Sequence, residues 1–162
     1  MLVEAALILP VLLLLLFGAI EFGLAVNDYQ SIRQGVREGA RNAVVADYGS
    51  STSCGINGSA SGAASDMKQV ICTTKEQAGL GDDLRVKVTY VPGTGNDGDY
   101  GRLKVCATRP AQSVTGIIAP FLSSVDLQSE IVMRAEKTLS LSATPAAETD
   151  PSGDNWSWCE AP

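Results

Sequence analysis

The chain lacks histidine altogether, and this absence narrows its chemistry more than any other feature of its composition. Histidine is the commonest general base near neutral pH and a frequent zinc ligand. Without it, a nucleophile–base pair would need a lysine as the base, and no motif indicates one. The two nearest cysteines, Cys54 and Cys72, are too far apart for a typical zinc site, and no Cys-x-x-Cys occurs. We therefore expect no catalytic residues, no cofactor and no metal site.

Positive charge is also scarce, and both charge and hydrophobicity are unevenly distributed. The 162 residues contain 12 Lys+Arg and 18 Asp+Glu, a formal net charge of −6, which argues against a protein that binds nucleic acid by neutralising phosphates. Residues 145–162 carry four acids, no base and no aliphatic run, whereas the first basic residue of the chain is Arg33. The chain thus combines an apolar N-terminal end with an acidic C-terminal tail.

The apolar end is a run without charge or strong polarity over residues 5–20. As a helix, this run spans about 24 Å at 1.5 Å per residue, short of the roughly 30 Å of membrane hydrocarbon. It reaches spanning length by continuing to Val26 through Glu21. A secretory signal peptide is disfavoured because no Lys or Arg precedes the run.

Two carboxylates, Glu4 and Glu21, flank this run, and a carboxylate in an apolar zone is costly unless it is paired. One interpretation pairs a buried glutamate with a protonated α-amino group of its own or a neighbouring chain, which suits helices that pack together. The alternative places Glu4 at the level of the headgroups, where it begins the helix and interacts favourably with its dipole.

The helical pattern continues beyond the apolar run. Apolar residues recur at spacings of three and four, as in an amphipathic helix: Tyr29, Ile32, Val36, Ala40 and Val44. One helix over residues 1–46 would be roughly 70 Å long. Pro10 removes a backbone donor within it, so we expect a kink or a loosened turn there.

Small residues recur at a strict spacing of four along the same helix: Ala19, Gly23, Asn27, Ser31, Gly35, Gly39 and Ala43. Such a row lets helix backbones approach closely. For residues 19–27 we favour packing against other helices. For Gly35 and Gly39, packing against other helices and packing against the protein's own sheet are equally supported.

The strings that carry a family resemblance lie in this helix: residues 2–10 (LVEAALILP), the leucines that follow, residues 17–23 (FGAIEFG) and residues 37–45 (REGARNAVV). They resemble the TadE/TadG-like pilins, or pseudopilins, of tight-adherence (type IVb, Flp-type) pili. The resemblance is strong over residues 1–47 and loose over residues 84–138. Together with the flanking carboxylates, the proline and the row of small residues, it leads us to expect assembly roles for Glu4, Pro10, Glu21, Gly23, Gly35 and Gly39.

The resemblance implies a life cycle as well as a fold. Such proteins are cut by a membrane-embedded prepilin peptidase, are held in the membrane by the exposed helix, and are drawn into a filament by an ATPase-driven machine. In the family, the acidic residue is usually the fifth residue after the cleavage point, and an aromatic residue follows it. In this sequence Glu4 is the fourth residue, and Ala5 follows it. A substantial head is typical of the family's minor or pseudopilin members.

The remainder predicts a small head of the α+β class. We expect a Ser/Gly-rich loop over residues 50–65, a helix over 66–77 capped by Asp66, and a strand over 84–91. A hairpin partner over 103–108, a helix within 110–122 and a third strand over 125–141 follow. The long N-terminal helix then packs on an antiparallel sheet of about three strands with one or two short helices.

The four cysteines of an exported domain favour two disulfides, for which three pairings are possible. We prefer Cys54–Cys72, which holds the Ser/Gly-rich loop to the second helix, and Cys106–Cys159, which holds the acidic tail to a strand.

Three other motifs could indicate ligand binding, but for each of them a structural role is favoured. Residues 93–98 match a dinucleotide fingerprint but lead into a strand, so we expect a hairpin loop. Asn96, Asp97 and Asp99 lack EF-hand spacing, which favours a solvated turn over a calcium site. For Trp156 and Trp158, packing around Cys159 is favoured over a sugar-binding patch.

The sequence therefore predicts a structural subunit of a type IV-like pilus. Residues 1–26 are the membrane anchor and later the filament core, residues 27–141 the head, and residues 142–162 a disulfide-tethered tail. The expected partners are like pilin subunits, prepilin peptidase and assembly machinery, and the bilayer before assembly. The alternative is a single-pass anchored adhesin or pilus-assembly adaptor that never polymerises.

Overall fold

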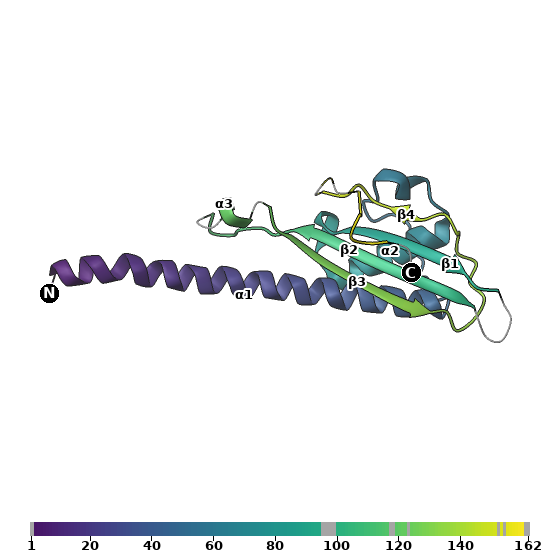
Figure 1. Cartoon of the computed structure of the whole chain (residues 1–162), viewed down its shortest axis with the longest axis horizontal. Helices are drawn as coiled ribbons and strands as arrows, with labels where there is room; N and C mark the ends of the chain where they lie inside the picture. The colour runs from purple at the N-terminus through teal and green to yellow at the C-terminus, as the bar shows by residue number, and fades with distance from the viewer. Residues whose placement is uncertain are drawn as a thin grey trace.

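The computed structural model describes residues 2–94, 100–116, 119–122, 124–151, 153 and 155–160. A single helix, α1 (Leu2–Val44), runs through the head and projects far beyond it (Figure 1). Its bounds agree with the expected 1–46 to within two residues. The helix is continuous through Pro10 and shows no sharp kink there (Figure 1). One missing hydrogen bond does not break a helix that leucines continue on both sides.

Four antiparallel strands form the sheet in the order β3-β2-β1-β4, which confirms the α+β class. Their bounds are Arg85–Pro92 for β1, Gly101–Pro110 for β2, Asp126–Arg134 for β3 and Ala146–Ala147 for β4. The expected third strand was too long, because β3 ends at Arg134, opposite Arg102 near the start of β2. The additional strand, β4, comes from the C-terminal tail and pairs with β1.

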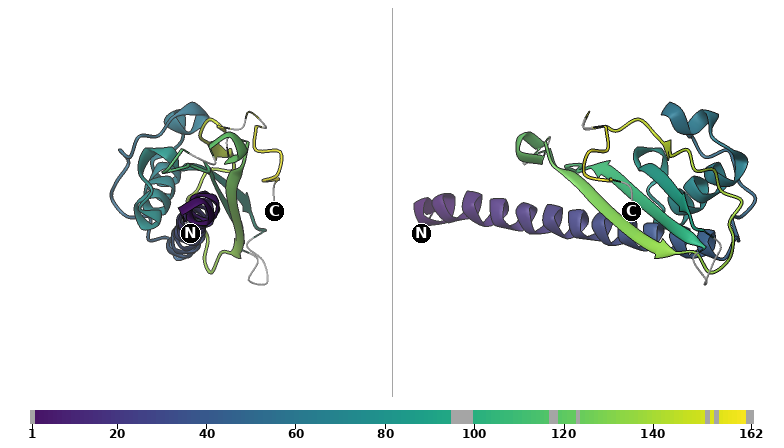
Figure 2. Two further views of the ribbon diagram at one scale, coloured as in Figure 1. Left: turned by 90° about the vertical axis from the view of Figure 1, so that its left-hand side faces the viewer. Right: turned by 45° about the vertical axis from the view of Figure 1, so that its right-hand side comes forward.

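Two helices cover one face of this sheet. The second, α2 (Ser65–Ala78), lies beside α1 on the same side (Figure 2). The core between helices and sheet includes the expected helical positions Ile32, Val36, Ala40 and Val44, whereas Tyr29 remains partly exposed. In β1, the side chains of one face, Val86, Val88 and Tyr90, are fully or almost fully buried, and Thr89 on the other face is 5% exposed.

Shorter elements differ more from expectation. α2 begins after Ala64, and Asp66 is not its cap but accepts a 2.8 Å hydrogen bond from Ser140 Oγ. Gly79 ends α2 in the left-handed conformation. The helix expected within 110–122 is reduced to α3 (Ala119–Leu122). Two short 3₁₀ helices, η1 (Gly58–Gly62) and η2 (Gly81–Asp83), complete the head. Residues 95–99, which include Asn96, Asp97 and Asp99, lie outside the described residues.

Candidate assembly and membrane-anchoring surface

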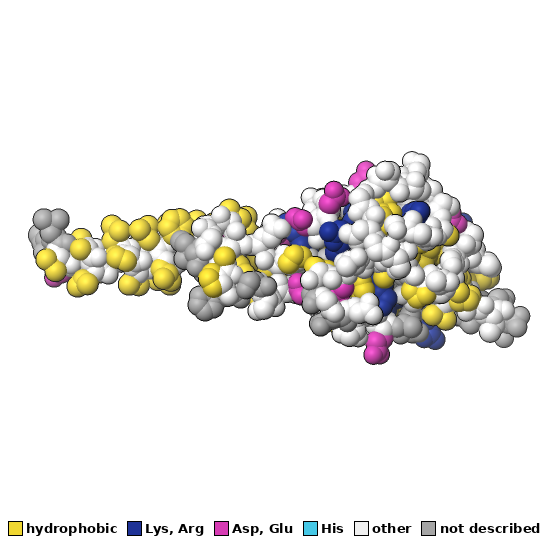
Figure 3. All heavy atoms as spheres, turned by 90° about the horizontal axis from the view of Figure 1, so that it is seen from above, with side chains coloured by type: hydrophobic (Ala, Val, Ile, Leu, Met, Phe, Trp, Pro, Cys, Tyr) yellow, Lys and Arg dark blue, Asp and Glu magenta, His cyan; other side chains and the backbone are white. Residues whose placement is uncertain are grey.

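The N-terminal half of α1, residues 2–26, forms a stalk outside the head (Figure 1). Every large hydrophobic side chain from Val3 to Leu16 is exposed in the single chain. Hydrophobic side chains line the visible face of the stalk, whereas most charged ones gather on the head (Figure 3). Within the described part of the chain, α1 is the one helix long and apolar enough to cross a membrane. The stalk therefore needs an apolar partner that the chain itself does not supply.

Glu4 and Pro10 both lie on this stalk. Glu4 occupies the first turn of α1 and is exposed, and Pro10 is exposed further along the same helix. The N-terminal part of α1, on which both residues lie, projects from the head (Figure 1). Their expected assembly roles therefore depend on contacts with other molecules.

Glu21 is placed differently, because its side chain is bound by the chain's own head. The residue is only 4% exposed. Its Oε1 accepts hydrogen bonds from Ser113 Oγ at 2.7 Å, from the Thr115 backbone N–H at 2.9 Å and from the Thr115 hydroxyl. Among the described residues, Oε2 has no hydrogen-bond partner. These donors belong to the segment between β2 and β3, residues 111–125, which we call the β2–β3 loop.

An ion pair holds the base of that loop to α1 as well. Arg109, near the end of β2, places its guanidinium 2.6 Å from Asp28 Oδ2 and 3.7 Å from Asp83 Oδ2. Glu21 and Asp28 are seven residues apart, two turns along one face of α1. The β2–β3 loop and its base are thus joined to α1 at two successive points.

The row of small residues serves two different surfaces. A Cβ atom at Gly35 would lie 2.7 Å from the Ala78 Cβ and from the Thr74 carbonyl oxygen, and one at Gly39 would lie within 3.2 Å of the Thr74 Cα. Both glycines therefore face α2, and neither of the expected partners, other chains or the sheet, is the one in contact. At Gly23 a Cβ would meet no atom within 4 Å.

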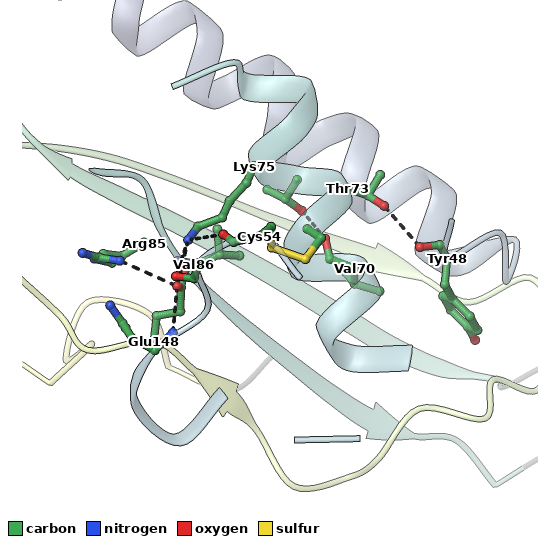
Figure 4. The surroundings of a disulfide bond; sticks show 12 residues. Tyr48, Cys54, Val70, Thr73, Lys75, Arg85, Val86 and Glu148 are labelled. Carbon is green, nitrogen blue, oxygen red and sulfur yellow. Dashed lines mark hydrogen bonds and ion pairs between the residues drawn. A yellow bond between two sulfur atoms is a disulfide. The ribbon is translucent and has the colours of Figure 1, made fainter. Parts of the chain in front are cut away.

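Two disulfides hold the irregular segments of the head. Cys54–Cys72 links the Ser/Gly-rich loop to α2 with Cα atoms 5.5 Å apart, and Cys106–Cys159 links the tail to β2 with Cα atoms 6.3 Å apart. These are the preferred pairings. Figure 4 shows the first disulfide beside a cluster of charged side chains.

That cluster centres on Glu148, which follows β4 and has a fully buried side chain. Its carboxylate lies 2.9 Å from Lys75 Nζ, accepts a 2.9 Å hydrogen bond from the Val86 N–H, and lies 3.8 Å from Arg85 (Figure 4). From the sequence, Glu148 is predicted only to be one of the four acidic residues of a polar tail. No local signal separates it from Asp150 or Glu160, since its partners lie far away in sequence.

The two tryptophans pack around the second disulfide, as expected. Trp156 is 3% exposed, forms a cluster with Cys106 and Cys159, and donates from Nε1 to the Glu148 carbonyl oxygen at 2.8 Å. Trp158 is partly buried against the same cluster. Among the described residues, no group of three or more acidic or cysteine side chains is placed to hold a metal ion.

Comparison with known proteins places the N-terminal helix in a family. A family model described as TadE-like protein matches residues 1–41, which confirms the resemblance over that helix. No curated protein and no solved structure matches the chain. The match and the apolar stalk fit a membrane-anchored protein associated with a tight-adherence pilus, and this family is structural rather than catalytic. Residues 1–41 of this chain are therefore similar to the TadE-like family.

Proposed function

We propose that this chain is a structural subunit of a tight-adherence, type IV-like pilus that polymerises into an extracellular filament for attachment. The observation that carries the proposal is the stalk, whose large hydrophobic side chains from Val3 to Leu16 are all exposed. Before assembly the bilayer covers this surface, and in the filament the stalks of like subunits cover it. Prepilin peptidase and the pilus assembly machinery are the partners implied for the transfer.

The transfer from lipid to a bundle of stalks changes little hydrophobic free energy, because lipid chains are as apolar as leucine. Close packing and polar pairing must therefore decide it. Gly23 offers open backbone for close packing, and Glu4 offers a carboxylate at the stalk's tip. Gly35 and Gly39 contribute by shaping the head, and Glu21 by fixing the stalk to it, so we assign direct subunit contacts to Glu4, Pro10 and Gly23.

Different parts of the chain then perform different tasks. Residues 1–26 anchor the protein and become filament core, while residues 27–141 form the head that faces solvent. Residues 142–162 close the head, with β4 in the sheet and Cys159 bonded to Cys106.

The test is incorporation into filaments sheared from cells, compared with the amount of protein in the membrane fraction. We expect Glu4→Ala and Gly23→Leu to abolish or strongly reduce the sheared fraction while the membrane-bound protein persists. Gly62→Leu is the matched control, because Gly62 lies on the head and a Cβ there also meets nothing within 4 Å. Unchanged filament yield from both stalk variants would refute these assembly roles.

Electron microscopy distinguishes this proposal from the alternative, an anchored adhesin or assembly adaptor that does not polymerise. Electron micrographs of filaments with this chain repeating along them support the pilus subunit. If the wild-type protein is found only as monomers in detergent and never in filaments, the alternative replaces it.

A further inference from the structure

The β2–β3 loop carries exposed apolar side chains and no charge, which is unusual for a loop on the surface of the head. Residues 111–125 contain no charged side chain. Among the described residues of this loop, Val114 is 75% exposed and Val125 is 42% exposed, and Ala119 and Pro120 are exposed as well. Exposed apolar side chains on an uncharged segment indicate a surface that meets an apolar partner.

The loop also lies at one particular end of the molecule. It extends beyond the end of the sheet in the direction of the N-terminus, with α3 alongside the stalk, in both views that show it from the side (Figures 1 and 2). The three hydrogen bonds to Glu21 Oε1 fix its first half against α1, and the Arg109–Asp28 ion pair fixes its base.

The position of Glu21 along α1 sets the level of the loop relative to a membrane. Glu21 lies about 26 Å from Glu4 along the helix axis at 1.5 Å per residue. A bilayer has about 30 Å of hydrocarbon. With Glu4 near one boundary of the hydrocarbon, Glu21 and the loop bound to it lie near the other, where hydrocarbon gives way to headgroups.

We propose that the β2–β3 loop is a second membrane contact, which inserts Val114, Ala119 and Pro120 into the interface of the leaflet on the head's side of the bilayer. The proposal rests on the membrane-anchored state of the proposed function and not on polymerisation. A lipid occupant is favoured over another protein because the loop continues the apolar surface of the stalk at the level where a bilayer ends. Apolar side chains without neighbouring charge suit the interfacial region.

The contact also explains why Glu21 is bound by the loop. A carboxylate near hydrocarbon is costly unless donors surround it. Ser113 and Thr115 supply three donors from the segment that would enter the interface with it. The loop thus accompanies the carboxylate to the membrane surface and fixes the head relative to the bilayer.

The test measures the depth of single spin labels on the full chain in lipid nanodiscs that hold one chain each. The four native cysteines are paired in disulfides, so an introduced cysteine is the only free thiol. Labels are placed through Val114→Cys on the loop, Val91→Cys at the opposite end of the head, and Leu13→Cys on the stalk. Val91 is a matched control because it is an exposed valine, 40% accessible, on the same head. Collisions with oxygen report hydrocarbon, and collisions with a water-soluble nickel chelate report water.

We expect the label at position 114 to collide with the nickel chelate several-fold less than the label at 91, and the label at 13 to be the most shielded. A second reporter, Val125→Cys, should show an intermediate value, since it lies at the base of the loop, where Val125 accepts a 2.8 Å hydrogen bond from Ala111.

If the label at 114 is as accessible to the chelate as that at 91 while the label at 13 is shielded, the loop proposal fails and membrane anchoring stands. If the label at 13 is also accessible to the chelate, both fail. Shielding at 114 that requires several chains per disc, or filaments, shows that a second copy covers the loop and overturns the lipid assignment.

Discussion

Substitution of glycine by alanine is expected to have opposite effects on the packing of α1 at the two ends of the row of small residues. At Gly35 a Cβ would lie 2.7 Å from the Thr74 carbonyl oxygen and 2.8 Å from the Ala78 backbone nitrogen. These obstacles are backbone atoms of α2, which cannot rotate away. At Gly23, on the same helix, a Cβ meets nothing within 4 Å. Gly35→Ala therefore requires α1 and α2 to separate, and Gly23→Ala does not.

The magnitude follows from two opposing terms. Alanine is favoured over glycine in a helix interior by about 1 kcal/mol. Overpacking of a close contact costs about 1–3 kcal/mol. Because backbone atoms at 2.7 and 2.8 Å cannot give way, we take the upper part of this range for Gly35→Ala, about 2–3 kcal/mol. The expected net loss in the free energy of unfolding of the head is then about 1–2 kcal/mol. Gly23→Ala lies outside the head's core and should change it by less than about 0.5 kcal/mol.

The assay is thermal unfolding of the detergent-solubilised chain, followed by the fluorescence of Trp156, which is buried in the head. For a chain of this size each kcal/mol shifts the midpoint by about 2–4 °C. Gly39→Ala is an informative companion, because its nearest obstacle is the Thr74 hydroxyl, which donates a buried 2.8 Å hydrogen bond to the Val70 carbonyl. Rotation of that hydroxyl would lose the bond.

A Gly35→Ala variant as stable as the wild type would refute the reasoning, because it would show that α1 and α2 are not in backbone contact at this position. A large loss for Gly23→Ala in the same assay would also contradict it, since that residue would then contribute to the head. Gly23→Ala is expected to alter filament yield instead, where a neighbouring helix meets the open backbone.

Three further substitutions test the head. In a denaturant titration, Glu148→Gln should lower the free energy of unfolding by about 3–5 kcal/mol, because it leaves the buried Lys75 without its negatively charged partner. The control Glu130→Gln, from a partly exposed ion pair with Lys104, should lower it by less than about 1 kcal/mol. Replacing Cys106 and Cys159 together by serine should cost about 4 kcal/mol on the chain-entropy model and shift tryptophan emission to the red; unchanged emission would mean that the tail stays packed without its disulfide. Burial, reinforced by a neighbouring lysine, lowers the pKa of Lys87, so the folded state binds that proton more weakly than the unfolded chain. The free energy of unfolding should therefore rise with pH between the lowered pKa of Lys87 in the folded state and its pKa of about 10.4 in the unfolded chain. Lys87→Met should reduce this dependence of the free energy of unfolding on pH.

Local periodicity explains which parts of the fold the sequence predicts. The amphipathic pattern of Ile32, Val36 and Ala40 and the alternation of Val86 and Val88 each lie within one element, so they identify α1 and β1 without any knowledge of their partners. The family strings lie in α1 for the same reason: the helix is a continuous segment.

The features that the sequence does not predict depend on distant partners. Glu148 is bound by Lys75, 73 positions away, and Glu21 by Thr115, 94 positions away. Nothing near Glu148 distinguishes it from an ordinary acid of a polar tail. Glu21 is recognisable as a costly carboxylate, but only the fold shows that the chain's own loop supplies its donors.

The same distinction explains how one helix serves two purposes. A spacing of four places small residues along one row of α1, and the row itself does not specify what packs against it. Along this row, α2 occupies the positions of Gly35 and Gly39, whereas Gly23 is open. On either side of Gly23, Glu21 and Asp28 bind the β2–β3 loop and Arg109 of the head. These two carboxylates therefore fix where the head is attached along α1, and moving them along the helix would move the attachment with them.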